Sequence, residues 1–170
     1  MQKKWVMIQK QPLLVERFSV ISIEEAVRKN DSVMKILNSL SKGASFGVSI
    51  ECGEKAIVSR EKCGILFREF SAGDKPDFVV IMQEEIFTKL FSEYTSTLNA
   101  GDFLVFAAKL LADEKDKINL VIYANFLKLT LHGYLKVLPL GGSAFWKVLK
   151  DNGLGSIFAI EKKLAAFKNK

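Results

Sequence analysis

The sequence has few of the residues that usually carry catalysis, metal binding or covalent cross-links. Among its 170 residues are one histidine and two cysteines. Cys52 and Cys63 lack the paired spacing of a zinc site. They fall near opposite ends of two adjacent predicted strands, where a disulfide bond is not expected to form. We therefore expect free thiols, as in the reducing cytosol, and we expect no metal ion and no cofactor.

The scarcity of histidine restricts acid-base catalysis, because histidine is the commonest general base. His132 lies four residues from both Lys128 and Lys136, so on a helix all three share one face. We interpret His132 as an exposed surface residue rather than a catalytic or metal-binding one. We expect that the protein is not an enzyme.

Three further candidates for chemistry have simpler interpretations. The adjacent carboxylates Glu84–Glu85 and Asp113–Glu114 lie at predicted helix ends, where they are solvated or stabilised by the helix dipole. Nothing apolar brackets them to raise a pKa. The Gly-Gly-Ser segment at 141–143 lacks both the lysine of a P-loop and the three glycines of a dinucleotide-binding turn. We expect this segment to end a helix rather than to bind an anion.

The chain also lacks a long apolar run. Lysines such as Lys109 and Lys128 interrupt the longest stretches, and none reaches the roughly 18 to 20 residues that a membrane-spanning helix needs. The first residues are basic and partly apolar, but Gln-Lys-Gln-Pro at 9–12 ends that run well short of a signal peptide. We therefore expect a soluble, cytoplasmic protein.

The charge and the aromatic content of the chain indicate which classes of partner it can bind. The formal net charge of +6 is concentrated in lysines near both ends of the chain. Such ends can contact an anionic membrane, or they can simply be solvated. Phenylalanine dominates the aromatic residues, with 13 Phe against three Tyr and two Trp, and many of these rings lie among Leu, Val and Ala in predicted helices. Nucleic-acid platforms interleave aromatic and basic residues on a sheet, so we expect no nucleic-acid partner.

The most informative segment that is present spans residues 103–112, Phe-Leu-Val-Phe-Ala-Ala-Lys-Leu-Leu-Ala. A helix on the surface of a two-layer domain has one apolar stripe and one charged face. This helix is apolar on every side, so more than the sheet has to cover it. The cover could be another helix of the chain, a bound apolar ligand, a partner subunit or a lipid surface.

Hydrophobic periodicity predicts the remaining elements. Residues 45–52 alternate as in a half-buried strand, and residues 77–83 are apolar on both faces, as in a central strand. Ser22 and Glu25 have the spacing of a capping box. The segment 126–138 fits a strand or a helix, and we favour the helix. The expected order is an extension over 1–21, helix 23–41, strands 45–52, 55–60, 63–70 and 77–83, helix 84–98, helix 102–112 capped by Asp102, strand 118–125, helix 126–138, helix 143–150 and a last helix after 155.

This order resembles the sterol-carrier-type (SCP-2-like) lipid-binding domain family. Two segments carry the resemblance, Pro-Asp-Phe-Val-Val-Ile-Met-Gln-Glu-Glu-Ile-Phe at 76–87 and Lys-Ile-Asn-Leu-Val-Ile-Tyr-Ala-Asn at 117–125. It covers about residues 24–138. The resemblance implies an α+β fold with a five-stranded, mostly antiparallel sheet and helices on one face. It also implies an elongated apolar cavity between helices and sheet for a sterol, fatty acid or acyl-coenzyme A.

By the same resemblance, the chain divides into an N-terminal extension over 1–22, a sterol-carrier-like domain over 23–138 and a C-terminal helical extension over 139–170. The segment 95–116 is longer than the family's usual link, and the extensions could plug the cavity or cover it as a lid. The residues implied to line the cavity come from two consecutive helices: Phe87, Leu90, Phe91, Phe103, Phe106 and Leu110.

Two hypotheses on function follow. The first is non-enzymatic binding or transfer of an apolar small molecule such as a fatty acid, an acyl-coenzyme A or another lipid. The alternative is an interaction module that uses the helix 103–112 or the basic tail 144–170 to contact a partner protein or a membrane surface. In either case we expect a monomer or a weak homodimer.

Overall fold

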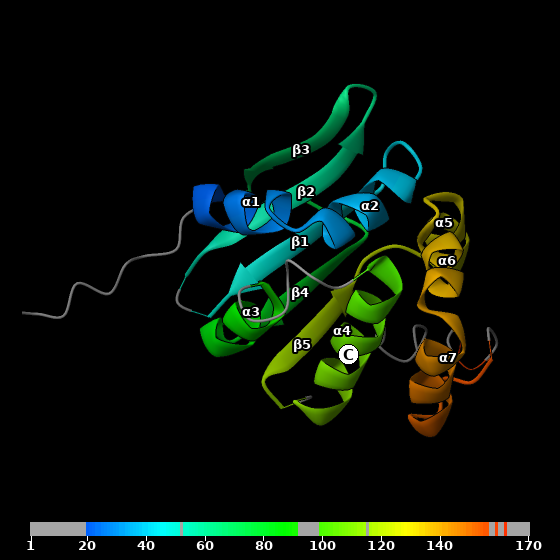
Figure 1. Cartoon of the computed structure of the whole chain (residues 1–170). Helices are drawn as coiled ribbons and strands as arrows, with labels where there is room; N and C mark the ends of the chain where they lie inside the picture. The colour runs from blue at the N-terminus through cyan, green and yellow to red at the C-terminus, as the bar shows by residue number, and fades with distance from the viewer. Residues whose placement is uncertain are drawn as a thin grey trace, which may run out of the picture.

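The computed structural model describes residues 20–51, 53–91, 99–114, 116–156, 159 and 162. Two helices come first, followed by four strands, two helices, a fifth strand and a helical C-terminal part, which is the predicted order except that two of the predicted helices are each divided (Figure 1). The elements are α1 (Val20–Arg28), α2 (Asp31–Ser39), β1 (Ser45–Ile50), β2 (Lys55–Glu61), β3 (Gly64–Glu69), β4 (Phe78–Met82), α3 (Glu84–Phe91), α4 (Ala100–Asp113), β5 (Ile118–Ile122), α5 (Phe126–Leu131), α6 (Tyr134–Val137), a 3-10 helix η1 (Leu138–Gly141) and α7 (Gly142–Asp151).

The five strands form one mixed sheet in the order β3-β2-β1-β4-β5. Three neighbouring pairs are antiparallel, and β1 and β4 pair in parallel with Phe46 opposite Phe78. The predicted α+β class with a mostly antiparallel five-stranded sheet is therefore confirmed. As its two apolar faces predict, β4 lies inside the sheet, between β1 and β5.

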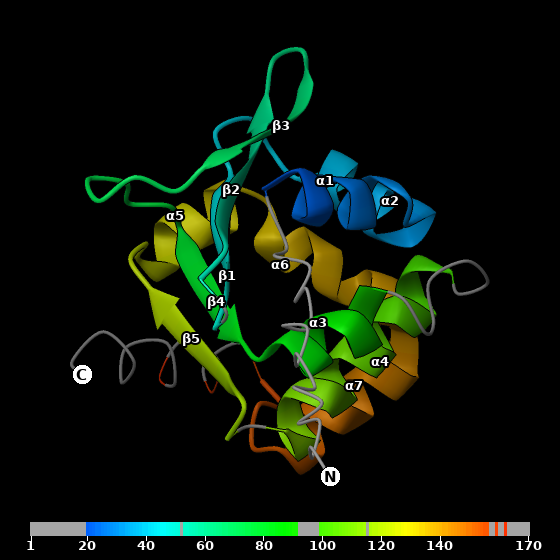
Figure 2. The same ribbon diagram turned by 90° about the vertical axis from the view of Figure 1, so that its left-hand side faces the viewer.

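The helices α1 to α4, α6 and α7 lie on one side of the sheet in Figure 2. Apolar side chains of α1 to α4 and α6 pack on the sheet face that carries Val48 and Ile50 of β1 and Met82 of β4, whereas α7 packs against α4. Ile23 of α1 and Phe87 of α3 are buried in the same core. Polar and apolar residues alternate along β1, and successive side chains of a strand point to opposite faces of the sheet. The apolar side chains of β1 therefore all point to the face that the helices cover.

The predicted helix over 23–41 is wrong in one respect: it is two helices. Asn30 separates them, and its fully buried side chain accepts a hydrogen bond from the Val33 backbone N–H at 3.1 Å. Asparagine is a strong N-cap, so a new helix begins after it. The proposed capping box is also wrong, because Ser22 lies inside α1 rather than before its first residue.

The residue that caps the start of α4 is not the predicted one. Asn99, not Asp102, caps the helix, because its Oδ1 accepts hydrogen bonds from the backbone N–H groups of Gly101 at 2.9 Å and Asp102 at 3.0 Å. Asp102 instead accepts a hydrogen bond from the Asn99 side-chain amide at 2.6 Å. Both asparagine and aspartate suit helix starts, so composition alone did not decide between them.

The segment 126–138, which fitted either a strand or a helix, is helical as we favoured. It forms two short helices rather than one. Gly133 has φ of 85°, the left-handed conformation that glycine adopts without strain, and it separates α5 from α6. The chain then continues through η1 into α7, where a short helix was expected.

Several expectations lie outside the described residues. These are the extension before residue 20, the end of the helix after Phe91, most of the last helix after Ser156, and the placement of Cys52. Cys63 is exposed and free. None of the helices in the described part of the chain is both long enough and apolar enough to cross a bilayer.

Candidate functional site

The six residues predicted to line an apolar site lie on α3 and α4. Phe87 and Phe103 are buried in the main core. Leu90, Phe91 and Leu110 are half-buried and pack against that core, and the Phe87 and Phe91 rings lie 4.7 Å apart. Phe106 is half-buried on α4. The structure therefore brings five of the six side chains into one apolar cluster, which Leu104 and Ala107 of α4 extend.

Helices of the same chain provide the additional cover that the all-apolar α4 requires. α4 packs against α2, η1 and α7. Even so, most of its apolar side chains stay half-buried rather than enclosed, and Leu111 is exposed. A layer of partly covered apolar side chains on α3 and α4 thus lies against the main core.

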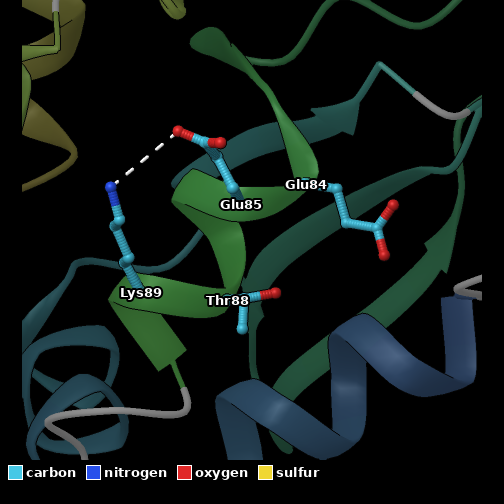
Figure 3. Close-up of a pocket in the computed structure, with 4 residues that line it drawn as sticks. All are labelled: Glu84, Glu85, Thr88 and Lys89. Carbon is cyan, nitrogen blue, oxygen red and sulfur yellow. Dashed lines mark ion pairs between the residues drawn. The ribbon is translucent and has the colours of Figure 1, made fainter.

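A second feature is a shallow depression of about 410 Å³ on the first turns of α3. Glu84, Glu85, Thr88 and Lys89 line it, and Figure 3 shows the Glu85 carboxylate facing the Lys89 ammonium. The two groups are 3.8 Å apart. Its charged walls do not suit a hydrocarbon tail, so this depression is not the predicted apolar site.

Two of the acidic residues at the ends of α3 and α4, Glu85 and Glu114, belong to one surface ion network. Lys117 Nζ lies 2.5 Å from Glu85 Oε1 and 3.2 Å from Glu114 Oε2, and Lys89 lies 3.4 Å from Glu114. The contacts with Lys117 hold the pKa values of both Glu85 and Glu114 below their usual range. A general acid needs a raised pKa, so these two carboxylates are not suited to that role.

A buried carboxylate forms the most connected polar cluster among the described residues. Asp77 immediately precedes β4, and its side chain is fully buried. Its Oδ2 accepts hydrogen bonds from the Ser45 backbone N–H and the Tyr134 hydroxyl, both at 3.0 Å, and lies 2.5 Å from His132 Nδ1. Its Oδ1 forms an ion pair with Lys128 at 2.9 Å, although the ammonium is not aligned for a hydrogen bond. One carboxylate therefore joins β1 and β4 to α5 and α6.

The main chain of Asp77 adds to this junction. Its N–H donates to the Ser45 carbonyl at 2.7 Å, and its carbonyl accepts from the N–H groups of Tyr123 and Ala124, both at 2.9 Å. Ala124, together with Ile122 and Leu129, forms a small apolar cluster beside the carboxylate. The start of β4 is thus tied both to β1 and to the segment that leads into α5.

The interpretation of His132 as an exposed surface residue is wrong. Its side chain retains 17% of its exposure, and Nδ1 faces Asp77. Lys128 does share a helix face with His132, as predicted, but that face is directed at a buried acid rather than at water alone. The partner is 55 residues away in sequence, so helical spacing could not identify it. Two features of the sequence could have indicated this contact: an acidic residue at the start of an apolar strand, and a helix face that carries only basic residues.

Burial and hydrogen bonding act on Asp77 in opposite directions. Burial alone would raise the pKa of the carboxyl, but the contacts from His132, Ser45 and Lys128 outweigh it and hold the pKa below its usual range. Burial raises the pKa of the Tyr134 hydroxyl, and the negative charge of Asp77 raises it further. Tyr134 therefore stays protonated as a hydrogen-bond donor, and Asp77 stays ionised.

The fold and the site define an α+β protein with an apolar helix layer on one face of a mixed sheet. No family model matches the chain, and no curated protein matches it. A solved structure titled UbiJ-SCP2 Ubiquinone synthesis protein is similar to it, with a TM-score of 0.39 and 13% identity over 72% of this chain and 94% of that chain. A TM-score below 0.5 is too low to establish a common fold, so the resemblance to sterol-carrier-type domains stays a prediction.

Proposed function

We propose that this protein binds an apolar small molecule without chemical conversion, and that the ligand lies between α3 and α4 on the helix side of the sheet. A fatty acid, an acyl-coenzyme A or another lipid with a long acyl chain fits this chemistry. The six predicted residues, Phe87, Leu90, Phe91, Phe103, Phe106 and Leu110, would contact the chain of the ligand.

One observation carries the proposal. The apolar side chains of α3 and α4 that adjoin the core, among them Leu90, Phe91 and Leu110, are half-buried although α2, η1 and α7 already pack against α4. Such side chains gain free energy when a ligand completes their burial, at about 25 cal/mol per Å² of apolar surface. Burial of the acyl chain contributes about 0.8 kcal/mol per CH₂ group, so no specific hydrogen bond is needed for affinity.

The non-enzymatic part of the proposal assigns the Asp77–His132 pair to structure. A histidine oriented by a carboxylate is also the arrangement of a general base, so the pair is the first place where catalysis would be sought. Here the carboxylate also accepts bonds from Ser45 and Tyr134, which tie it to β1 and α6. These contacts support a role in holding the helices on the sheet.

A displacement assay with a fluorescent fatty acid tests the proposal. Ala107 belongs to the half-buried layer on α4, so Ala107→Phe should fill ligand space and weaken binding by about tenfold or more. Leu111→Phe enlarges an exposed side chain on the same helix and serves as the matched control, with binding unchanged. Native mass spectrometry of the purified protein should show a co-purified lipid.

Two results would reject the proposal. The first is a clean apo mass together with no displacement by fatty acids of any chain length. The second is equal binding by the Ala107→Phe variant and the wild type, which would place the ligand elsewhere. Circular dichroism on both variants verifies that each is folded.

A further inference from the structure

The helix α5 presents two leucines to solvent. Leu127 and Leu131 are 65% and 66% exposed, more than any other large apolar side chain among the described residues. They are four residues apart, so they lie one above the other on one face of the helix. At about 100° per residue, that face is opposite to Leu129, which is buried in the small cluster with Ile122 and Ala124.

The contacts of Asp77 fix this orientation. Lys128 of α5 and His132, which caps the end of α5, both reach the buried carboxylate, at 2.9 Å and 2.5 Å. The helix therefore cannot rotate to bury Leu127 and Leu131 without breaking an ion pair at a buried acid. The exposure of the two leucines is a fixed property of the fold.

The segment that carries the two leucines has more basic than acidic residues. Residues 118–150, which form β5, α5, α6, η1 and most of α7, contain four lysines and no aspartate or glutamate. α5, α6 and α7 follow one another along one edge of the molecule (Figure 1). The Ser41 N–H donates to the His132 carbonyl at 2.9 Å, which places the exposed Lys42 at the end of α5. Lys136 of α6 is exposed as well.

We propose that α5 is a membrane-docking surface, in which Leu127 and Leu131 insert into an anionic lipid surface while Lys42 and Lys136 contact the headgroups. Exposed leucines flanked by lysines are the combination that binds such surfaces, through apolar burial and electrostatic attraction together. The excess of positive charge favours this occupant over a second copy of the chain, because two basic surfaces repel each other. The inference does not depend on the ligand site between α3 and α4.

The test is co-sedimentation of the full chain with vesicles. Vesicles of equal parts phosphatidylglycerol and phosphatidylcholine should sediment the wild type, and vesicles of phosphatidylcholine alone should sediment it poorly. The double variant Leu127→Gln/Leu131→Gln should bind the anionic vesicles about tenfold more weakly. The matched control, Leu66→Gln/Leu111→Gln, changes two leucines that are each 49% exposed, on β3 and α4, and should bind as the wild type does.

Three outcomes would overturn the inference: no sedimentation of the wild type, equal sedimentation of the α5 variant, or a larger loss in the control. Binding that persists in about 0.5 M NaCl would also contradict the electrostatic part, because salt screens surface charges. Thermal unfolding checks that the variants are folded. Fatty-acid displacement in solution should be unchanged in the α5 variant, so failure of the docking surface is distinguishable from failure of the proposed function.

Discussion

Asp77 shows how much of the stability can depend on one side chain. Asp77→Asn keeps the shape of the group but removes the charge that Lys128 faces, and it leaves an amide where His132 and Tyr134 need an acceptor. We expect a loss of about 3 kcal/mol in the free energy of unfolding, measured in urea. Asp113→Asn changes an exposed aspartate and should cost about 0.5 kcal/mol or less. Equal losses in both variants would refute the role of the cluster.

The same residue predicts a dependence of stability on pH. The pKa of Asp77 is lower in the folded protein than in the unfolded chain, so its contribution is present above the unfolded value of about 3.9. That contribution is lost as the pH falls from there through the folded pKa. The difference in unfolding free energy between the wild type and Asp77→Asn should therefore shrink below about pH 4. A difference that stays constant down to about pH 2 would show that the carboxylate is not the titrating group.

Residue-level prediction from the sequence succeeded where neighbours along the chain decide the outcome. The carboxylates Glu84 and Glu85 do lie in the first turn of α3, as their position before an apolar helix predicts. His132 was misinterpreted because its partner comes from the start of β4, and helical spacing carries no information on a contact across 55 residues. The burial of an acid is a property of the assembled layers, not of its flanking sequence.

Among the secondary-structure elements, α2 depends on its cap. Asn30→Ala removes the acceptor for the Val33 N–H and should destabilise the protein by about 1 to 2 kcal/mol, measured by chemical unfolding. Asn38→Ala is the control, because Asn38 is exposed near the end of the same helix and its replacement by alanine improves helix propensity. If Asn30→Ala were as stable as Asn38→Ala, the break between α1 and α2 would need another explanation.

The junction of α5 and α6 allows a second comparison. Gly133 and Gly153 both have positive φ, 85° and 76°, so alanine is strained at either position, by about 1 kcal/mol. A Cβ at Gly133 would also lie 3.2 Å from the Ser41 backbone N, whereas a Cβ at Gly153 meets nothing within 4 Å. Gly133→Ala should therefore lower the midpoint of thermal unfolding more than Gly153→Ala. The reverse order would show that α5 and α6 are not held against the turn at Ser41.

Element boundaries were less predictable than element types. The strands β1 and β4 follow from alternation and from a run that is apolar on both faces, which are local patterns. The parallel pairing of β1 with β4 could not be derived from periodicity, because it joins segments more than 30 residues apart. The helix breaks at Asn30 and Gly133 interrupt continuous apolar stripes, and there a single cap or a left-handed glycine outweighs the stripe.

For the whole molecule, the apolar helix α4 links the sheet-bound helices to the C-terminal part of the chain. α4 packs against α2 on one side and against η1 and α7 on others. The six candidate ligand residues could be proposed from the resemblance, and the fold brings five of them into one apolar cluster. The space available to a ligand depends instead on side-chain packing, which no local pattern encodes.

This arrangement predicts the effect of two truncations. A chain that ends after Val137 loses η1 and α7, which exposes the apolar surface of α4 that they cover. We expect aggregation in gel filtration and increased fluorescence of a hydrophobic dye such as ANS, because an exposed apolar patch of this kind favours association. A chain that ends after Ser156 keeps η1 and α7 and should stay as compact as the full chain. If both truncations behave alike and remain monomeric, the residues after Val137 form a dispensable extension. If only the shorter chain aggregates, η1 and α7 are part of the structural unit that contains the sheet, because α4 needs them to complete its burial.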